Sequence, residues 1–135
     1  TYIEPADPLA YARHYLESPW PGVGPRNVLM TYGQGDSYTP PITGRVLAAS
    51  AGFAPAGFIL DPYEALELYG DVTALDAPVC ENHLAPGGDS TAVVVQYPSL
   101  SGDGHFVVFN ETLANRQALA FFATEAYLGC ATLVE

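Results

Sequence analysis

The sequence contains no lysine, and its four arginines stand against 15 acidic residues, which gives a formal net charge of −11. Such a surface repels phosphate backbones and anionic lipid, so we expect neither a nucleic-acid partner nor a role at a membrane surface. No run approaches 18 consecutive apolar residues, so no membrane span is expected. The acidic residues are scattered and form no D-x-[DN]-x-[DN]-G loop, so we predict no metal site and no cofactor.

Cysteine is nearly as scarce, with Cys80 and Cys130 alone. They form no C-x-x-C motif and no Cys/His spacing that suits zinc. The pair is compatible with one disulfide, which would close a loop of about 50 residues and contribute roughly 4 kcal/mol. Two buried free thiols are the alternative. A disulfide would favour a secreted, periplasmic or cell-envelope protein, although the first residues do not have the pattern of a signal peptide.

The length of 135 residues fits one domain or part of one. Apolar periodicity, Pro/Gly punctuation and β-branched runs predict the local structure. The expected elements are a helix over 8–18, a Pro/Gly linker over 19–25, a strand over 26–33, a helix over 41–53, a short strand over 56–61, an irregular stretch over 62–88 with one helical turn near 63–69, a strand over 90–98 and an amphipathic helix over 112–129. The last helix is expected to bury a face made of Leu113, Ala114, Ala118, Phe121, Phe122, Glu125 and Leu128.

The alternation of strands and helices predicts an α/β sheet that is mostly parallel. The two strong strands are near-continuous apolar runs, which is typical of strands that are covered on both faces. Two such strands are too few for a complete sheet. We therefore expect the chain to be the tail end of a larger α/β domain, with a helix and linker over 1–26 and the late strands, their loops and the final helix over 27–135.

Two polar residues follow the two strong strands. Asp36 comes after the strand that ends near Gly33, and His105 follows the strand that ends near Pro98. In open α/β sheets, functional groups gather beyond the carboxyl ends of the strands. If the strands are parallel neighbours, both side chains enter one crevice, where a carboxylate can orient an imidazole for proton transfer. The simpler alternatives are that Asp36 stabilises its own turn or caps the next helix, and that His105 is an ordinary loop residue.

These residues also carry a resemblance. "VLMTYGQGDSYTPPITGRVLAASAGF" followed by "TAVVVQYP" and "GDGHFVVFN" resembles the C-terminal part of α/β-hydrolase-fold serine hydrolases. In that family the triad acid often stands in a G-x-x-D-x-x-x-P setting, and the triad histidine in a Gly-His-aromatic setting. The first setting matches Gly33, Asp36 and Pro40; the second matches Gly104, His105 and Phe106. The resemblance implies hydrolysis of carboxylic esters or related acyl substrates, with Asp36 as acid and His105 as base.

The chain departs from the family pattern because the nucleophilic serine precedes the acid in that family, and no G-x-S-x-G occurs here. The A-x-S-x-G around Ser50 lies in a predicted helix, and it would require another acid (Asp61, Asp71, Asp76 or Asp89). Thr1 is conceivable as an N-terminal nucleophile, but nothing around it supports that role. We therefore expect the serine to lie on another segment of the hydrolase, either a separate chain or sequence absent from this one.

Other histidines and aromatic residues could also belong to the site, although each has a simpler structural explanation. His14 fits a surface position on the first helix, and His83 is a loop residue beside Cys80 that could line the crevice. Tyr32, Tyr38 and Phe106 flank the expected site and could shape an acyl pocket, although core packing is the default for aromatic residues. Besides the hydrolase, two functional hypotheses stay open: a hydrolase-like structural or ligand-binding module without catalysis, and a self-contained acidic α/β domain that binds an unknown ligand.

Overall fold

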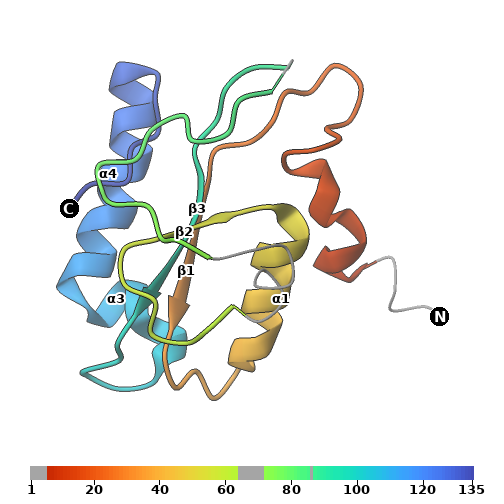
Figure 1. Ribbon diagram of the computed structural model, residues 1–135. Helices are drawn as coiled ribbons and strands as arrows, with labels where there is room; N and C mark the ends of the chain where they lie inside the picture. The colour runs from red at the N-terminus through yellow and green to blue at the C-terminus, as the bar shows by residue number, and fades with distance from the viewer. Residues whose placement is uncertain (1–5, 64–71, 86) are drawn as a thin grey trace.

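The computed structural model describes residues 6–63, 72–85 and 87–135, and it confirms an α/β architecture (Figure 1). Its sheet has three parallel strands in the order β1 (Val28–Gly33), β3 (Ala92–Tyr97) and β2 (Ala54–Ala56). The pairing of β1 with β3 runs from Val28 opposite Ala92 to Gly33 opposite Tyr97. The two strong strands are therefore parallel neighbours, as the sequence predicted.

Helical segments cover both faces of the sheet. The 3₁₀ helix η2 (Pro8–His14) and α1 (Pro41–Ala51) lie on one side, while α3 (Val107–Asn110) and α4 (Thr112–Leu128) lie on the other (Figure 1). The central strand β3 serves both layers, because successive side chains of a strand point to opposite faces. Ala92 and Val94 pack in the core beside α1, whereas Val93 and Val95 pack in the core beside α4. Each buried valine contributes about 1.5 kcal/mol or more to stability.

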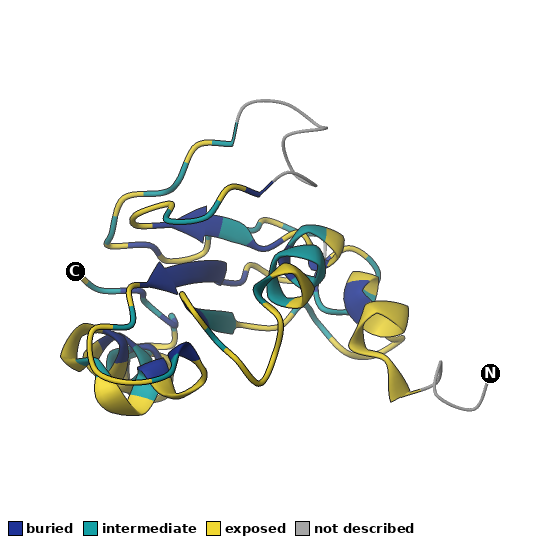
Figure 2. Cartoon of the chain, turned by 90° about the horizontal axis from the view of Figure 1, so that it is seen from below, coloured by how far each residue is buried: buried dark blue, intermediate teal, exposed yellow. Residues whose placement is uncertain are grey.

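The two strong strands differ in burial. All six residues of β3 are buried, as the dark-blue strand in the middle of the sheet shows in Figure 2, whereas the first four residues of β1 are only half-buried. The expectation that both strands are covered on both faces thus holds for β3 and not for β1. The reason is position: within the described residues β1 pairs with β3 alone, so it forms an edge of the sheet.

Several predicted boundaries are wrong. The strand expected over 56–61 is β2 at Ala54–Ala56, because Gly57 takes a left-handed conformation (φ 72°) and ends it. The first helix is a 3₁₀ helix, and it ends at His14 rather than at Ser18. The loop before the last helix contains η3 (Gly104–Phe106) and α3, which sequence periodicity missed because they are too short to show it. The helical turn expected near 63–69 falls almost wholly outside the described residues.

The last helix is present, and its expected buried face is confirmed only in part, at Ala114 and Phe121. Ala114, Gln117 and Phe121 are buried, while Leu113, Phe122 and Leu128 are exposed. Polar contacts account for the burial of Gln117: the Tyr97 hydroxyl at the end of β3 donates to Gln117 Oε1 over 2.5 Å, and Gln117 Nε2 donates to the Val134 carbonyl over 2.5 Å. A buried polar side chain needs such partners, so the glutamine turns toward the sheet.

The C-terminal tail is tied to the loop before β3. Val79 and Leu133 form an antiparallel bridge, and a disulfide joins Cys80 to Cys130 across 50 positions of the sequence. The disulfide interpretation of the two cysteines is therefore confirmed over the free-thiol one. A disulfide fits an oxidising compartment such as the extracellular space. None of the helices in the described ranges is long and apolar enough to cross a membrane.

Candidate active site

Asp36 organises the turn that follows β1. Its Oδ1 accepts hydrogen bonds from the backbone amides of Tyr38 and Thr39, both at 2.8 Å, just before α1 begins at Pro41. This is the turn-stabilising role that a short acidic side chain commonly fills. It occupies only one carboxylate oxygen, so Oδ2 is left for a second partner.

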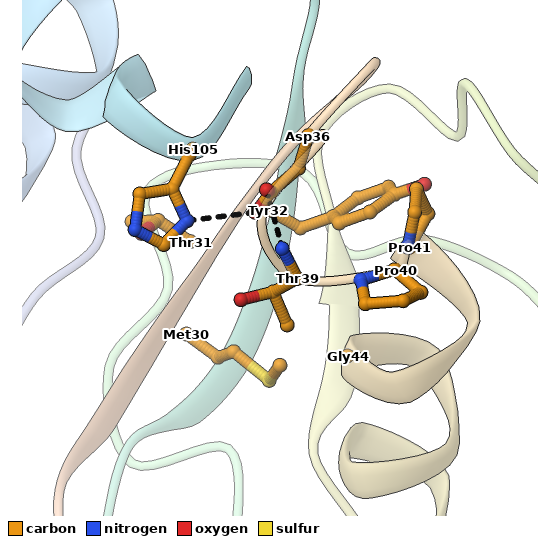
Figure 3. Close-up of a pocket in the computed structure, with 9 residues that line it drawn as sticks. All are labelled: Met30, Thr31, Tyr32, Asp36, Thr39, Pro40, Pro41, Gly44 and His105. Atoms are coloured by element: carbon orange, nitrogen blue, oxygen red, sulfur yellow. Dashed lines mark hydrogen bonds and ion pairs between the residues drawn. The ribbon is translucent and has the colours of Figure 1, made fainter. Parts of the chain in front are cut away.

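That second partner is His105. Its Nδ1 lies 3.2 Å from Asp36 Oδ2, although the residues are 69 positions apart in the sequence (Figure 3). The Asp36 side chain is 14% exposed and the His105 side chain is 41% exposed. A carboxylate at Nδ1 makes that nitrogen the proton donor and leaves Nε2 as a proton acceptor. The structure thus brings together the two residues that the sequence singled out.

Hydrogen bonding keeps Asp36 ionised. Partial desolvation acts to raise the pKa of its carboxyl group, but the amides of Thr39 and Tyr38 and the His105 ring outweigh that effect and hold the pKa below its usual value. Hydrogen bonds to the charged form of a carboxylate always act in this direction. Asp36 is therefore an anion at neutral pH and can stabilise positive charge on the imidazole.

Two glycines let the two loops meet. A Cβ on Gly104 would lie 2.5 Å from the Gln34 carbonyl oxygen and 2.7 Å from the Asp36 nitrogen, and a Cβ on Gly33 would lie 2.0 Å from the Gly104 oxygen. Real Cβ atoms essentially never come within 3.0 Å of such backbone atoms. The glycines of both sequence motifs are thus required because backbone packs directly on backbone beneath the Asp36–His105 pair.

A pocket of about 230 Å³ opens beside the pair (Figure 3). Consecutive residues of β1 line it from both faces of that strand, so the pocket lies along the outer edge of β1. Its remaining walls come from the Asp36 turn, the first turns of α1 and the His105 ring. The lining residues are Met30, Thr31, Tyr32, Asp36, Thr39, Pro40, Pro41, Gly44 and His105.

Aromatic rings border the histidine as expected, with different roles. The Tyr38 ring centroid lies 4.9 Å from that of His105, and Phe106 meets the imidazole edge-on at 5.0 Å. Tyr38 and Phe106 also contact each other edge-on at 5.6 Å. Tyr32 instead lines the pocket and donates its hydroxyl proton to the Asp61 carboxylate. Burial, reinforced by this hydrogen bond, raises the pKa of Tyr32 and keeps its hydroxyl protonated.

A hydrogen-bond network around Gln96, which the sequence did not predict, holds the loop that carries Asp61, the partner of Tyr32. Gln96, a buried residue of β3, accepts hydrogen bonds from the Leu60 amide at 2.5 Å and the Asp61 amide at 2.7 Å. It also donates to the Asp61 carbonyl at 2.7 Å. The only sequence signal is a single amide side chain within a run of valines. This network fixes the loop after β2 against the end of the sheet, and so places the Asp61 carboxylate under Tyr32.

The other candidate residues from the sequence lie away from the pocket beside His105. Ser50 is exposed near the end of α1, which runs into a left-handed Gly52 cap as predicted (φ 77°), so it does not sit on a strand-to-helix elbow. His83 pairs with Ser90 before the start of β3, at the opposite end of that strand from the site. His14 is half-buried rather than a plain surface residue, and its ring stacks on Trp20 with centroids 4.4 Å apart.

Two of the weighed residues, Thr1 and Asp71, fall outside the described residues. Asp76 and Asp89, like Ser50 and His83, are absent from the lining of the pocket beside His105. Within the described ranges, one group of side chains has three potential metal-ligand atoms close together, namely Cys80, Glu81 and Cys130. Both of its sulfur atoms are used in the disulfide, so the group does not form a metal site.

Comparison of the chain with protein-family models, with curated proteins and with solved structures finds no match.

Proposed function

We propose that this chain belongs to a serine hydrolase that cleaves carboxylic esters or related acyl substrates. Asp36 and His105 are the acid and base of its triad. The observation that carries the proposal is the hydrogen bond between His105 Nδ1 and Asp36 Oδ2 at the rim of the pocket. Both residues follow the carboxyl ends of adjacent parallel strands, where α/β sheets place their functional groups.

The proposed mechanism uses each group in one way. Asp36 fixes the His105 tautomer, so that Nε2 takes the proton of an attacking serine hydroxyl. The carboxylate then stabilises the imidazolium while the tetrahedral intermediate forms, and the imidazolium returns the proton to the leaving alcohol. Water attacks the acyl-enzyme in the same way, with His105 again as base. The His105 side chain is 41% exposed, so a partner from outside this chain can approach it.

The serine in this proposal lies on a further segment of the hydrolase, of which this chain forms the C-terminal part. The outer edge of β1 is where that segment would join. The edge makes no strand pairing within the described residues, and the pocket follows it. A strand added in parallel to this edge would end beside Asp36 and His105, and so could deliver a nucleophile to them. The disulfide favours a secreted or cell-envelope enzyme.

Two observations favour a non-catalytic alternative, in which the chain binds a ligand in the pocket. No serine of this chain stands in a G-x-S-x-G motif, and Ser37, next to Asp36, donates its hydroxyl proton to Asp103 rather than to His105. In this alternative Asp36 only stabilises the turn in which it lies, and His105 lines a binding site without transferring a proton.

Labelling with a fluorophosphonate probe, followed by a denaturing gel and mass spectrometry, separates these functions. We expect the label on a serine outside residues 1–135, either on a co-purifying polypeptide or on an additional segment of the same one. Label on Ser50 or Thr1 would overturn the assignment of Asp36 and His105 as partners of an outside serine. The absence of label from the intact protein would support the binding module.

A further inference from the structure

Asp103 connects the two loops of the site, a feature that the triad pattern does not require. Its Oδ1 accepts hydrogen bonds from the His105 amide at 2.9 Å and from the Ser37 amide at 3.2 Å. Its Oδ2 accepts the Ser37 hydroxyl proton at 2.5 Å. Ser37 and Asp103 are 66 positions apart, and each is next or nearly next to one member of the Asp36–His105 pair. One carboxylate therefore joins the turn after β1 to the turn after β3.

A local role explains only part of this geometry. Asp103 is the N-cap of η3, and capping accounts for its bond to the His105 amide. Asp7 caps η2 in the same way, with its Oδ1 accepting from the Leu9 amide at 3.0 Å. No bond from Asp7 to a residue distant in sequence is seen within the described ranges. Asp103 makes two such bonds to Ser37, so it does more than end its own helix.

The two acids act on the histidine from different directions. Asp36 holds the imidazole ring through Nδ1, whereas Asp103 holds the backbone that carries the ring. The hydrogen bonds from Ser37 and from the His105 amide keep the pKa of Asp103 below its usual value. His105 is the titratable group that acts on Asp103, and its positive charge would lower this pKa further. Asp103 thus remains a hydrogen-bond acceptor across the neutral range.

We propose that Asp103 is a positioning residue, which clamps the His105 turn to the Asp36 loop through Ser37 and so sets the alignment of the Asp36–His105 pair. The catalytic consequence of this clamp rests on the proposed function, but the clamp itself does not. Asp103 is not among the residues that line the pocket, and its hydrogen bonds go to the His105 amide and to Ser37, so it acts on the imidazole through the backbone of His105 and through its own charge.

The clamp is tested by following backbone amide resonances of the ¹⁵N-labelled protein from pH 2 to pH 7. The amide protons of Ser37 and His105 should shift with one common midpoint, because one carboxylate accepts from both. The amides of Tyr38 and Thr39 should follow a separate titration, that of Asp36. Asp103→Asn should abolish the common transition and leave the Asp36 transition in place. Different midpoints for Ser37 and His105, or a transition that survives Asp103→Asn, would overturn the clamp.

The effect on alignment has its own signature. The His105 Nδ1 proton should give a downfield resonance in the unaltered protein, because it donates to a carboxylate. Asp103→Ala should broaden or remove this resonance, while Asp103→Asn, whose amide oxygen can still accept from both backbones, should retain it in part. Asp7→Ala is the matched control, since it removes a cap that lies outside the site. An unchanged resonance in Asp103→Ala would show that Asp103 does not set the alignment.

Turnover of an ester substrate by the intact hydrolase distinguishes failure of the clamp from failure of the proposed function. Asp103→Ala should lower kcat about tenfold or more with KM within about twofold, Asp103→Asn should recover part of the loss, and Asp7→Ala should change neither. If Asp36→Asn abolishes turnover and Asp103→Ala does not affect it, the positioning role is wrong and the triad stands. If neither variant affects turnover, the proposed function is wrong, and the resonances alone decide on the clamp.

Discussion

The backbones of Gly33 and Gly104 lie in direct contact, with the Gly104 carbonyl oxygen occupying the space where a Cβ of Gly33 would stand. This contact seats the turn after β3 on the end of β1. It explains why Asp36 and His105, which stand on different loops, come within 3.2 Å of each other. The geometry of the site therefore depends first on two residues without side chains, and then on the polar groups above them.

Replacing either glycine should damage both the fold and the site. Gly104→Ala places a methyl group within 2.7 Å of three backbone atoms of the opposite loop, and backbone cannot yield as a flexible side chain does. We expect a loss of about 1–3 kcal/mol in the free energy of unfolding, as for overpacked interiors. Denaturant unfolding measures it. Gly87→Ala is the control, because its nearest neighbour would lie at an ordinary 3.4 Å. Equal losses in the two variants would contradict the close approach.

If the protein is the hydrolase proposed above, Asp36→Asn should leave the fold intact and abolish most of its ester turnover. The amide oxygen can still accept from Tyr38 and Thr39, but an amide nitrogen next to Nδ1 favours the wrong imidazole tautomer. By analogy with the known triad, kcat should fall about 10⁴-fold. Asp89→Asn, at an exposed position before β3, is the control for loss of one negative charge. Turnover unchanged in Asp36→Asn would remove this residue from the site.

Stability should fall in acid partly because of the site carboxylates. The folded protein holds the pKa of Asp36 and of Asp103 below the usual value. The unfolded chain therefore binds more protons around pH 4, and stability rises with pH there. The contribution is fully present above the ordinary aspartate pKa of about 3.9 and is lost as the pH falls through the lower folded values. Thermal melts from pH 2 to pH 6 should show a flatter pH dependence for Asp36→Asn. An identical pH dependence of stability in the unaltered protein and in Asp36→Asn would contradict the lowered pKa of Asp36.

The disulfide should be a major source of stability. Joining Cys80 to Cys130 closes a loop of 50 residues, which in the chain-entropy model contributes about 4 kcal/mol. Chemical unfolding with and without a reductant measures this directly. The double variant Cys80→Ala/Cys130→Ala should match the reduced protein and should be insensitive to reductant. A loss below about 1 kcal/mol would show that the bridge constrains the unfolded chain far less than its length predicts.

Residues 1–135 expressed alone should be unstable or self-associate. The half-buried edge of β1 presents unpaired backbone groups, and such an edge recruits other strands. Exposed apolar side chains on the outer face of the C-terminal helix, such as Phe122 and Leu128, add to this tendency. Light scattering and calorimetry provide the measurement. A cooperative transition of a monomer would contradict the proposal that a further segment completes the sheet.

The sequence identified the features that local chemistry controls. The β-branched run before Tyr97 predicts β3 because such side chains favour extended backbone. Two prolines before Ile42 and a glycine at position 52 mark the ends of α1. Asp36 and His105 were found because each is a polar residue that follows a strongly apolar strand. Each of these signals spans only a few consecutive residues, so the sequence carries it without reference to the rest of the chain.

Long-range contacts decided the rest. The order β1–β3–β2 makes Asp36 and His105 neighbours, and no local pattern encodes strand order. Gln96 and Gln117 are polar residues whose burial makes sense only with their partners in place, the loop amides at 60–61 and the Tyr97 hydroxyl. The second of these contacts buries Gln117 on α4, a position that the apolar periodicity of the helix does not predict. Sequence alone thus determined β1, β3, the two ends of α1 and the two candidate residues. Tertiary structure decided their juxtaposition, because hydrogen bonds between distant segments form only once the sheet has assembled.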